Sequence, residues 1–557
     1  MTGQNAAVAE GMATPGAANL AQNSTTLPPI GGAANRDAVN PWLIAITVTL
    51  ATFMELLDTA IANVSLPHIA GGLACSYDEA TWVLTSYLVA NAVVLPLSAW
   101  LSRVFGRKRY YMICVALFTL SSALCGMAPN LGMLIFFRVL QGIGGGGLAP
   151  VEQAILVDTF PPHKRAAAFA LYSMAIVTAP ALGPPLGGWI TDSFSWRWVF
   201  LINIPIGLIS LFLSNRLVHD SDAFKKEVSE ARSAGKLRID GFGIFLVALG
   251  FAFLEVVLDR GEREEWFDST FICVFFGVAM ISLLTALWWE LRHPDPVVEV
   301  RLLKERNFAI ANILYFVFGF VLFGSTVMIP QMLQSLMGYT ATDAGLVLGP
   351  GAFVIVVLAP FVVRLLPKIG AKRMIGFGLT VLGCAMWYFS TFDTLTDYKH
   401  EAWARALQGF GLAFLFVPVS QVAYSRLPKN KNNKASSLTN LFRNQGGSFG
   451  IAFVTTMLAR RAQYHQSVLV ETINNTDPAT QSAITSMSQT FAMNGAPQGT
   501  ADAMAKGQIY QMVQDQSHML AFIDCFYALG WVAFCAATLA FFIVNVAPAP
   551  KPEEPAH

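Results

Sequence analysis

Long apolar runs recur along almost the whole chain, and they restrict its fold more than any other feature of the sequence. About 20 consecutive apolar residues are enough to cross the hydrocarbon of a bilayer. In hydrocarbon the backbone must satisfy its own hydrogen bonds, which an α-helix does within a single segment. Charged residues make up only 13% of the chain, about half of their share in soluble proteins. The sequence therefore predicts an all-α polytopic membrane protein. The fourteen expected transmembrane helices lie at about 41–69, 79–102, 110–128, 131–158, 165–191, 197–216, 241–259, 270–290, 308–335, 341–366, 372–392, 401–425, 436–459 and 520–546.

Lys and Arg are concentrated in every second connection between these runs. They are dense at 103–109, 217–240, 364–373 and 426–434, whereas the intervening connections hold few of them. Positively charged connections remain on the cytoplasmic side of a membrane. Both termini are therefore expected to be cytoplasmic.

Three polar segments lie outside the expected helices. Residues 1–40 lack the charged and apolar regions of a signal peptide, so we expect a disordered cytoplasmic tail. A second, short cytoplasmic tail is expected at 547–557. The connection 460–519 is long and rich in Gln, Ser, Thr and Asn. It is either a flexible linker or a folded segment that faces a partner.

The sequence repeats itself across its two halves. The segment Arg138–Gly144 (R-V-L-Q-G-I-G) recurs as Arg405–Gly411 (R-A-L-Q-G-F-G), 267 residues later. The loop Leu101–Arg109 recurs as Leu365–Arg373, 264 residues later. Repeats in the same orientation are typical of transporters built from two parallel halves. The expected domains are an N-terminal six-helix bundle at 41–216, a cytoplasmic linker with an inserted helix pair at 217–307, and a C-terminal six-helix bundle at 308–546.

Two carboxylates lie in the first apolar run. Glu55 and Asp58 are three residues apart, so they share one face of a helix. A carboxylate in hydrocarbon costs about 2.5–3.5 kcal/mol on insertion scales, which favours a functional role. The depth of Arg138 differs from that of Asp58 by only about 6 Å, within reach of its side chain. Asp58 is either a proton carrier that pairs reversibly with Arg138 or a structural carboxylate in a static pair. Glu55 is expected to be a second proton site or to bind cationic substrate.

Further polar residues interrupt the apolar runs. Glu152 lies about 21 Å along its helix from Arg138, so it belongs to another site. It is either an entry point for cationic substrates or an acid that reaches toward the membrane surface. Asn440 and Arg443 are expected to line the cavity from the second half. The remaining acids in the runs are nearer helix ends and are expected to be solvated. They are Glu255, Glu290 and Asp524.

Several classes of site are absent from the sequence. The glycines at 144–147 precede no Gly-Lys-Ser/Thr, so close helix packing explains them better than phosphate binding. The seven cysteines are scattered and form neither a disulfide framework nor a metal-ligand pattern. We therefore expect no enzyme, no catalytic residues, no metal and no cofactor.

The motifs, in their order along the chain, resemble the fourteen-helix drug:proton antiporters of the major facilitator superfamily, and among these the EmrB-type multidrug exporters. The resemblance spans about 41–546. It rests mainly on Leu57–Pro67 (L-D-T-A-I-A-N-V-S-L-P), on Ala179–Gly188 (A-P-A-L-G-P-P-L-G-G) and on Pro330–Gln334 (P-Q-M-L-Q). It implies a major facilitator fold with a substrate cavity lined by Asn63, Gln141, Glu152, Gln331, Gln334, Asn440 and Arg443. It also implies helix-packing and conformational roles for Gly183, Pro184, Gly187, Gly188, Gly106 and Arg107.

One loop departs from the superfamily pattern. Between the second and third helices, that pattern has an acidic residue three positions before the Gly that here is Gly106, and this chain has Arg103 in its place. EmrB-type members also lack the acid, so the departure supports the subfamily. It argues against the usual charge-relay gate at this loop.

The resemblance implies proton-coupled efflux of amphipathic drugs and toxic compounds across the bacterial inner membrane. It further implies partners, namely a periplasmic membrane-fusion adaptor and an outer-membrane channel, and no nucleic acid. Two alternatives remain open. One is an exporter of a single metabolite, such as a siderophore or a fatty acid. The other is a membrane sensor or scaffold that transports nothing.

Overall fold

A computed structural model gives the fold of residues 40–161, 163–220, 224–225, 229, 240–427, 431–473 and 478–544. The two expected tails lie outside the described residues, and so does much of the 217–240 connection. The first helix, α1 (Pro41–Val64), begins at a proline, which the first turn of a helix accommodates well because its amide hydrogen needs no partner there.

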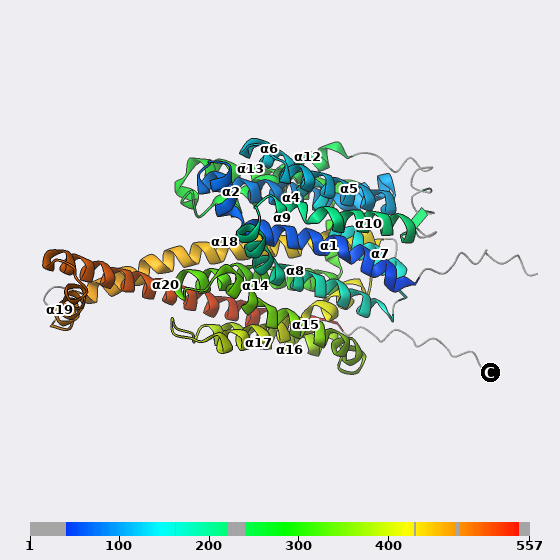
Figure 1. Cartoon of the computed structure of the whole chain (residues 1–557). Coiled ribbons are helices and arrows are strands. Elements are labelled where there is room, and N and C mark those ends of the chain that lie inside the picture. Colours follow the sequence, from blue (N-terminus) through cyan, green and yellow to red (C-terminus); the bar gives the residue numbers. More distant parts are fainter. Residues whose placement is uncertain are drawn as a thin grey trace, which may run out of the picture. The chain divides into compact units, whose positions relative to one another are not determined.

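The described part of the chain is built from helices, as predicted (Figure 1). The N-terminal half contains α1, α2 (Leu66–Gly72), α3 (Tyr77–Ala80), α4 (Trp82–Phe105), α5 (Arg107–Gly126), α6 (Leu131–Gly145), α7 (Leu148–Thr159), α8 (Arg165–Ser193), α9 (Trp198–Leu201) and α10 (Asn203–Leu217). The inserted pair is α12 (Gly241–Arg260) and α13 (Thr270–Arg292), with the short η1 (Trp266–Asp268) between them and η2 (Val300–Lys304) after them. The C-terminal half contains α14 (Arg306–Leu336), α15 (Ala341–Ile369), α16 (Ala371–Phe389), α17 (Tyr398–Tyr424), α18 (Asn432–Thr472), α19 (Pro478–Met493), α20 (Gln498–Leu539) and η4 (Ala540–Phe542).

The expected count of fourteen spans is not confirmed. Twelve stretches of the described chain are long and apolar enough to cross a membrane. The expected spans 372–392 and 436–459 coincide with α16 and α18, which are helical but are not among the twelve. In α18 the reason is its polar content, since Asn440, Arg443 and Gln445 fall where a lipid-facing helix would be apolar. These three side chains are buried against other helices.

The repeated loops have the same backbone conformation. Gly106 and Gly370 precede α5 and α16, and both have φ of 87°, with ψ of 145° and 147°. Glycine adopts a positive φ without steric cost, which explains why both loops use it. We call the end of the molecule that carries these two Lys- and Arg-containing loops the basic end. The division into two six-helix bundles stays a prediction.

The glycine run at 144–147 divides the expected span into two helices, α6 and α7, which together form one candidate membrane span, Leu131–Thr159. The expected close packing is present in the last turns of α6, before the break. A Cβ at Gly142 would lie 2.5 Å from the Tyr87 carbonyl oxygen of α4, and one at Gly144 would lie 2.7 Å from the Phe118 amide of α5. Glycine at these positions therefore lets three helices approach one another.

The described residues of the connection 460–519 are mostly helical, which favours the folded segment over the flexible linker. In Figure 1, α18 and α20 run side by side and α19 lies at their far ends, away from the other helices. The two long helices have 41 and 42 residues. At 1.5 Å per residue each is about 60 Å long, roughly twice the thickness of the hydrocarbon.

The two halves contact each other near the basic end. The Ser98 hydroxyl of α4 lies 3.0 Å from the Ser437 hydroxyl of α18, and the Ser436 hydroxyl donates to the Pro150 carbonyl of α7 at 2.9 Å. All four residues are buried. The halves are therefore closed against each other at this end.

Candidate functional site

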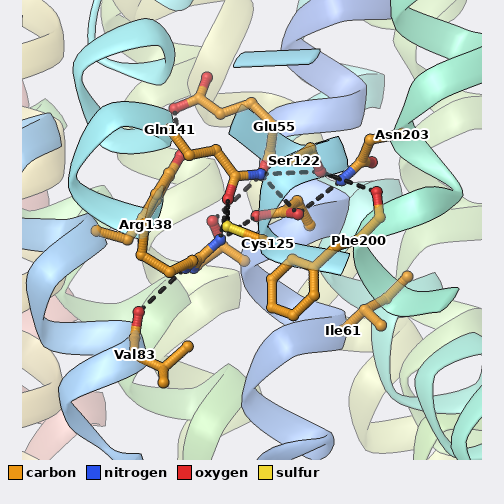
Figure 2. A network of polar contacts seen from close by, with 12 residues as sticks. Glu55, Ile61, Val83, Ser122, Cys125, Arg138, Gln141, Phe200 and Asn203 are labelled. Carbon is orange, nitrogen blue, oxygen red and sulfur yellow. Dashed lines mark hydrogen bonds and ion pairs between the residues drawn. The ribbon is translucent and has the colours of Figure 1, made fainter. Parts of the chain in front are cut away.

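The structure brings Asp58 of α1 and Arg138 of α6 together, as the depth comparison suggested. Figure 2 shows Arg138 and Gln141 with the neighbouring Ser122 and Asn203. The Arg138 Nη1 atom donates to Asp58 Oδ2 at 2.6 Å and to Gln141 Oε1 at 2.7 Å. Its Nε donates to the Val83 carbonyl of α4 at 3.0 Å. Both charged side chains are 0% exposed. The ion pair is thus sealed inside the N-terminal half.

The second oxygen of Asp58 accepts two neutral donors. Gln141 Nε2 donates to Asp58 Oδ1 at 3.0 Å, and Asn203 Nδ2 of α10 donates to the same atom at 2.6 Å. Both amides also donate to the Ser122 hydroxyl of α5, at 3.2 and 3.0 Å. Sequence reasoning missed Asn203 and Ser122. Each is a polar residue inside an apolar run, which could have marked it in the sequence. Without its depth in the membrane, that position does not identify the residue's partner.

Aromatic rings enclose the guanidinium of Arg138. Its Cζ atom lies 4.3 Å from the ring centroid of Tyr87 and 5.6 Å from that of Phe200. Its Nη2 is buried and has no hydrogen-bond partner among the described residues. A buried cation is strongly destabilising when its counter-ion is removed. Loss of the Asp58 charge would therefore force this cluster to rearrange.

Glu55 belongs to a neighbouring cluster. Its Oε1 accepts from Asn91 Nδ2 at 2.9 Å and from the Tyr87 hydroxyl at 3.3 Å. Within the described chain its Oε2 has no partner, and the residue is 7% exposed. Tyr87 connects the two acids, because its ring covers Arg138 while its hydroxyl contacts Glu55.

A band of polar groups links the two halves at the depth of Glu152. Glu152 Oε1 accepts from the Thr49 hydroxyl of α1 at 2.6 Å, while its Oε2 has no partner in the described structure. Arg443 Nη1 of α18 donates to the Tyr172 hydroxyl of α8 at 2.7 Å, and that hydroxyl donates to Asn440 Oδ1 at 3.2 Å. Glu152 is 0% exposed. It therefore does not reach toward the membrane surface, which was one of its two expected roles.

The other cavity residues expected from the motifs are not part of these buried clusters. Asn63, Gln331 and Gln334 are exposed. Gln334 Nε2 donates to the Pro330 carbonyl of its own helix at 3.2 Å. A lining role for these three residues stays a prediction.

The residues with expected packing roles lie at close helix contacts. A Cβ at Gly183 of α8 would lie 2.3 Å from Ala60 Cβ of α1, and one at Gly187 would lie 3.2 Å from Ile61. Pro184 and Gly188 are buried within the same helix.

Arg107, at the start of α5, forms an ion pair with Asp158 at the end of α7. Its Cζ also lies 4.2 Å from the ring centroid of Phe224. The pair is thus internal to the N-terminal half.

At the basic end the segment after α13 bridges the two halves. Asp295 accepts from Arg103 of α4 at 3.0 Å and from Lys434 of α18 at 3.1 Å. Lys434 also pairs with Glu299 at 2.9 Å. Partial burial works to raise the pKa of Asp295, but Lys434 and Arg103 more than offset it and lower the pKa below its usual value. The arginine at the acidic position of the loop motif is thus paired with a carboxylate from the connection.

The C-terminal half repeats the Arg138 cluster without its acid. Arg405 of α17 donates to Gln408 Oε1, and Gln408 Nε2 donates to the Ser325 hydroxyl of α14 at 2.7 Å. The repeat offset of 267 residues places Ser325 at the position of Asp58. A hydroxyl therefore occupies the place of the carboxylate.

The expectation that three further acids are solvated is wrong for at least two of them. Glu255 of α12 is 3% exposed and Glu290 of α13 is 2% exposed, because neighbouring helices cover both side chains. Asp524 of α20 is partly buried and pairs with Arg461 at 2.5 Å and His465 at 2.7 Å.

The helical fold, with twelve candidate membrane spans in the described chain, is that of a polytopic membrane protein. The chain belongs to the Major Facilitator Superfamily, whose family model matches residues 48–451. This confirms the family that the motifs predicted.

Its relatives include the EmrB-type multidrug exporters. The chain is 35% identical to the multidrug export protein EmrB of Escherichia coli K12 over 501 residues, covering 90% of this chain and 94% of the relative. It is 34% identical to the fatty acid resistance protein FarB of Neisseria gonorrhoeae over 502 residues, covering 90% and 94%.

Solved structures show the same fold at low sequence identity. The proton:xylose symporter XylE matches with a TM-score of 0.58 at 15% identity, covering 91% of this chain and 96% of the symporter. The human organic anion transporter MFSD10 matches with a TM-score of 0.56 at 12% identity, covering 90% and 99%. These likenesses concern the fold alone.

Proposed function

We propose that the protein exports amphipathic compounds across the bacterial inner membrane in exchange for protons, with the basic end and both termini in the cytoplasm and α16 and α18 completing fourteen spans. The main supporting observation is the sealed Asp58–Arg138 pair. The Asp58 side chain is 0% exposed within a membrane helix. Placing a carboxylate there costs free energy, so its presence favours a functional role. The relatives named as multidrug exporters support the substrate class.

In this proposal Asp58 carries the proton. The ionised carboxylate accepts Arg138, Gln141 and Asn203. A proton on Oδ2 would displace the Arg138 donor at 2.6 Å and leave the guanidinium without its counter-ion. The cluster joins α1, α4, α5, α6 and α10, so its rearrangement would bias the packing of the whole N-terminal half. That bias would couple proton binding to the exchange between inward- and outward-open states.

Substrate is proposed to bind along the polar band between the halves. Glu55 and Glu152 each keep one oxygen without a partner among the described residues, and either could accept a cationic group. Among the described residues Arg443 donates hydrogen bonds to neutral groups, the Tyr172 hydroxyl and Asn444 Oδ1, and could hold an anion. The predicted lining residues Asn63, Gln141, Gln331, Gln334 and Asn440 belong to this proposal.

The same Arg443 favours one alternative, export of a single anionic metabolite such as a fatty acid, and a relative named as a fatty acid resistance protein supports it. The partners remain proposals in both cases. They are a periplasmic membrane-fusion adaptor and an outer-membrane channel, with the α18–α20 extension as the part available to them.

The test is substrate uptake driven by a proton gradient in proteoliposomes that hold purified wild type, Asp58→Asn or Asp268→Asn. Asp268 is exposed, so its variant controls for the loss of an acidic side chain. An imposed proton gradient should drive substrate uptake in wild type and in Asp268→Asn, and Asp58→Asn should show none. Equal proton-driven transport by Asp58→Asn would refute its role as carrier. A wild type that moves neither drugs nor fatty acids would favour a sensor or scaffold.

A further inference from the structure

The inserted helix α12 is fastened to the N-terminal half. Asp259 accepts from the Thr85 hydroxyl of α4, and Arg263 Nη1 donates to the Thr81 hydroxyl at 2.6 Å. The Arg260 Cζ lies 4.3 Å from the ring centroid of Trp82. These contacts join the end of α12 and the connection after it to the start of α4. That end lies opposite the basic end.

Two further contacts connect the same segment to the C-terminal half. Glu255 Oε1 accepts from the Ser448 hydroxyl of α18 at 2.7 Å, and its Oε2 accepts from Gln445 Nε2 at 3.4 Å. Trp266 Nε1 donates to the Thr456 hydroxyl at 2.9 Å. Helix α12 therefore spans the boundary between the halves, and Glu255 is its buried acid on the α18 side.

The partners of Glu255 are both neutral. On its own helix the nearest titratable neighbours in sequence are Asp259 and Arg260, which are engaged with α4. On α18 the guanidinium of Arg443 is bonded to Tyr172. The charged residues of α4 and α13, Arg103, Glu290 and Arg292, fall at the basic-end turns of those helices. Glu255 itself is the fifteenth residue of α12 and about 8 Å from the other end.

An ionised carboxylate with only neutral partners is unfavourable in a membrane span. The site can also hold the neutral acid. Gln445 Oε1 is buried and has no hydrogen-bond partner in the described chain, so after the amide turns over it can accept from a protonated Glu255. Separation of the halves at this end would expose Glu255 to water, which favours the ionised form.

We propose that Glu255 is a second proton-binding residue of the transporter, which is protonated when α12 closes on α18 and ionised when the halves separate. The inference rests on the proposed proton-coupled export. Proton binding to Glu255 favours closure of the end opposite the basic end, and proton release favours its opening. The inserted pair thus gives this chain a coupling site separate from Asp58, located where the halves must part.

The test measures the proton-to-substrate ratio. The proton gradient across the proteoliposome membrane is held fixed while the substrate gradient is varied. The substrate gradient at which net substrate flux is zero gives the ratio. Wild type is compared with Glu255→Gln and with Glu290→Gln. Glu290 is a buried acid of the same inserted pair, so its variant is the matched control.

Glu255→Gln should lower the ratio by one proton per substrate and flatten the acidic limb of the pH–rate profile. Glu290→Gln should keep the wild-type ratio, and Glu255→Asp should restore it. An unchanged ratio in a Glu255→Gln protein that still transports would overturn the inference. If the Glu255→Gln protein transports nothing, the inference is tested with Ser448→Ala, which removes a hydrogen-bond donor to Glu255 but keeps the carboxyl group. A pH profile of Ser448→Ala that matches wild type at lower rate would likewise overturn it. Failure of the proposed function is distinct, since wild type itself would then show no coupled flux.

Discussion

The Asp58–Arg138 pair should make the stability of the protein strongly non-additive. Asp58→Asn leaves the enclosed Arg138 guanidinium without a counter-ion. It also turns one acceptor into a donor facing Arg138 or Asn203, which are 2.6 Å away. Removing one member of a buried ion pair costs about 3–5 kcal/mol. Arg138→Gln should cost a similar amount, because Asp58 then retains only its two amide donors.

The double variant Asp58→Asn/Arg138→Gln removes both charges together. What remains lost is a few hydrogen bonds, each worth about 1 kcal/mol. We therefore expect the double variant to be more stable than either single variant, with a coupling free energy of at least about 2 kcal/mol. The assay is unfolding by SDS in mixed micelles, followed by tryptophan fluorescence. Arg405→Gln is the matched control, since within the described chain this buried arginine donates its side-chain hydrogen bond to a neutral amide, and its removal should be nearly neutral. Additive losses at Asp58 and Arg138 would refute the reasoning.

Two more predictions follow from the repeated cluster and from the basic end. Ser325→Asp places an acid at the position equivalent to Asp58 and should stabilise the protein by about 1–3 kcal/mol through a charged contact with Arg405. SDS unfolding measures this, and the gain should vanish in an Arg405→Gln background. The pKa of Asp295 lies below its ordinary value of 3.8. The stabilisation from its ion pairs is therefore fully present above about pH 5 and is lost as the pH falls through the lowered pKa. The contribution of Asp295 to stability, measured by SDS unfolding as the difference between wild type and Asp295→Asn, should thus be constant between pH 8 and about 5. A difference that shrinks near pH 6 would contradict this assignment.

The sequence predicted the helical class, the repeat and the contact of Asp58 with Arg138, because depth along a helix can be counted from residue numbers. It could not predict which way each polar side chain faces. Asn203 and Ser122 complete the cluster only because α10 and α5 pack beside α1, which no spacing along one helix reveals.

The error over Glu255 has the same origin. Because Glu255 lies five residues from the end of its helix, we expected its side chain to be solvated. The side chain instead faces α18 and is covered by it. For 460–519 the sequence left a linker and a folded segment both open, since its polar composition suits either, and the helices of its described residues favour the second.

The length of α18 and α20 would convert a small tilt of the C-terminal half into a larger displacement at their far ends. Helices α18 and α20 are about 60 Å long, and about half of that length lies beyond the hydrocarbon. A tilt of the C-terminal half by about 10° would carry the α19 tip through about 5 Å, by the geometry of a rigid helix. A partner that grips the tip would sense each turnover as a mechanical displacement, with no contact to the transported compound.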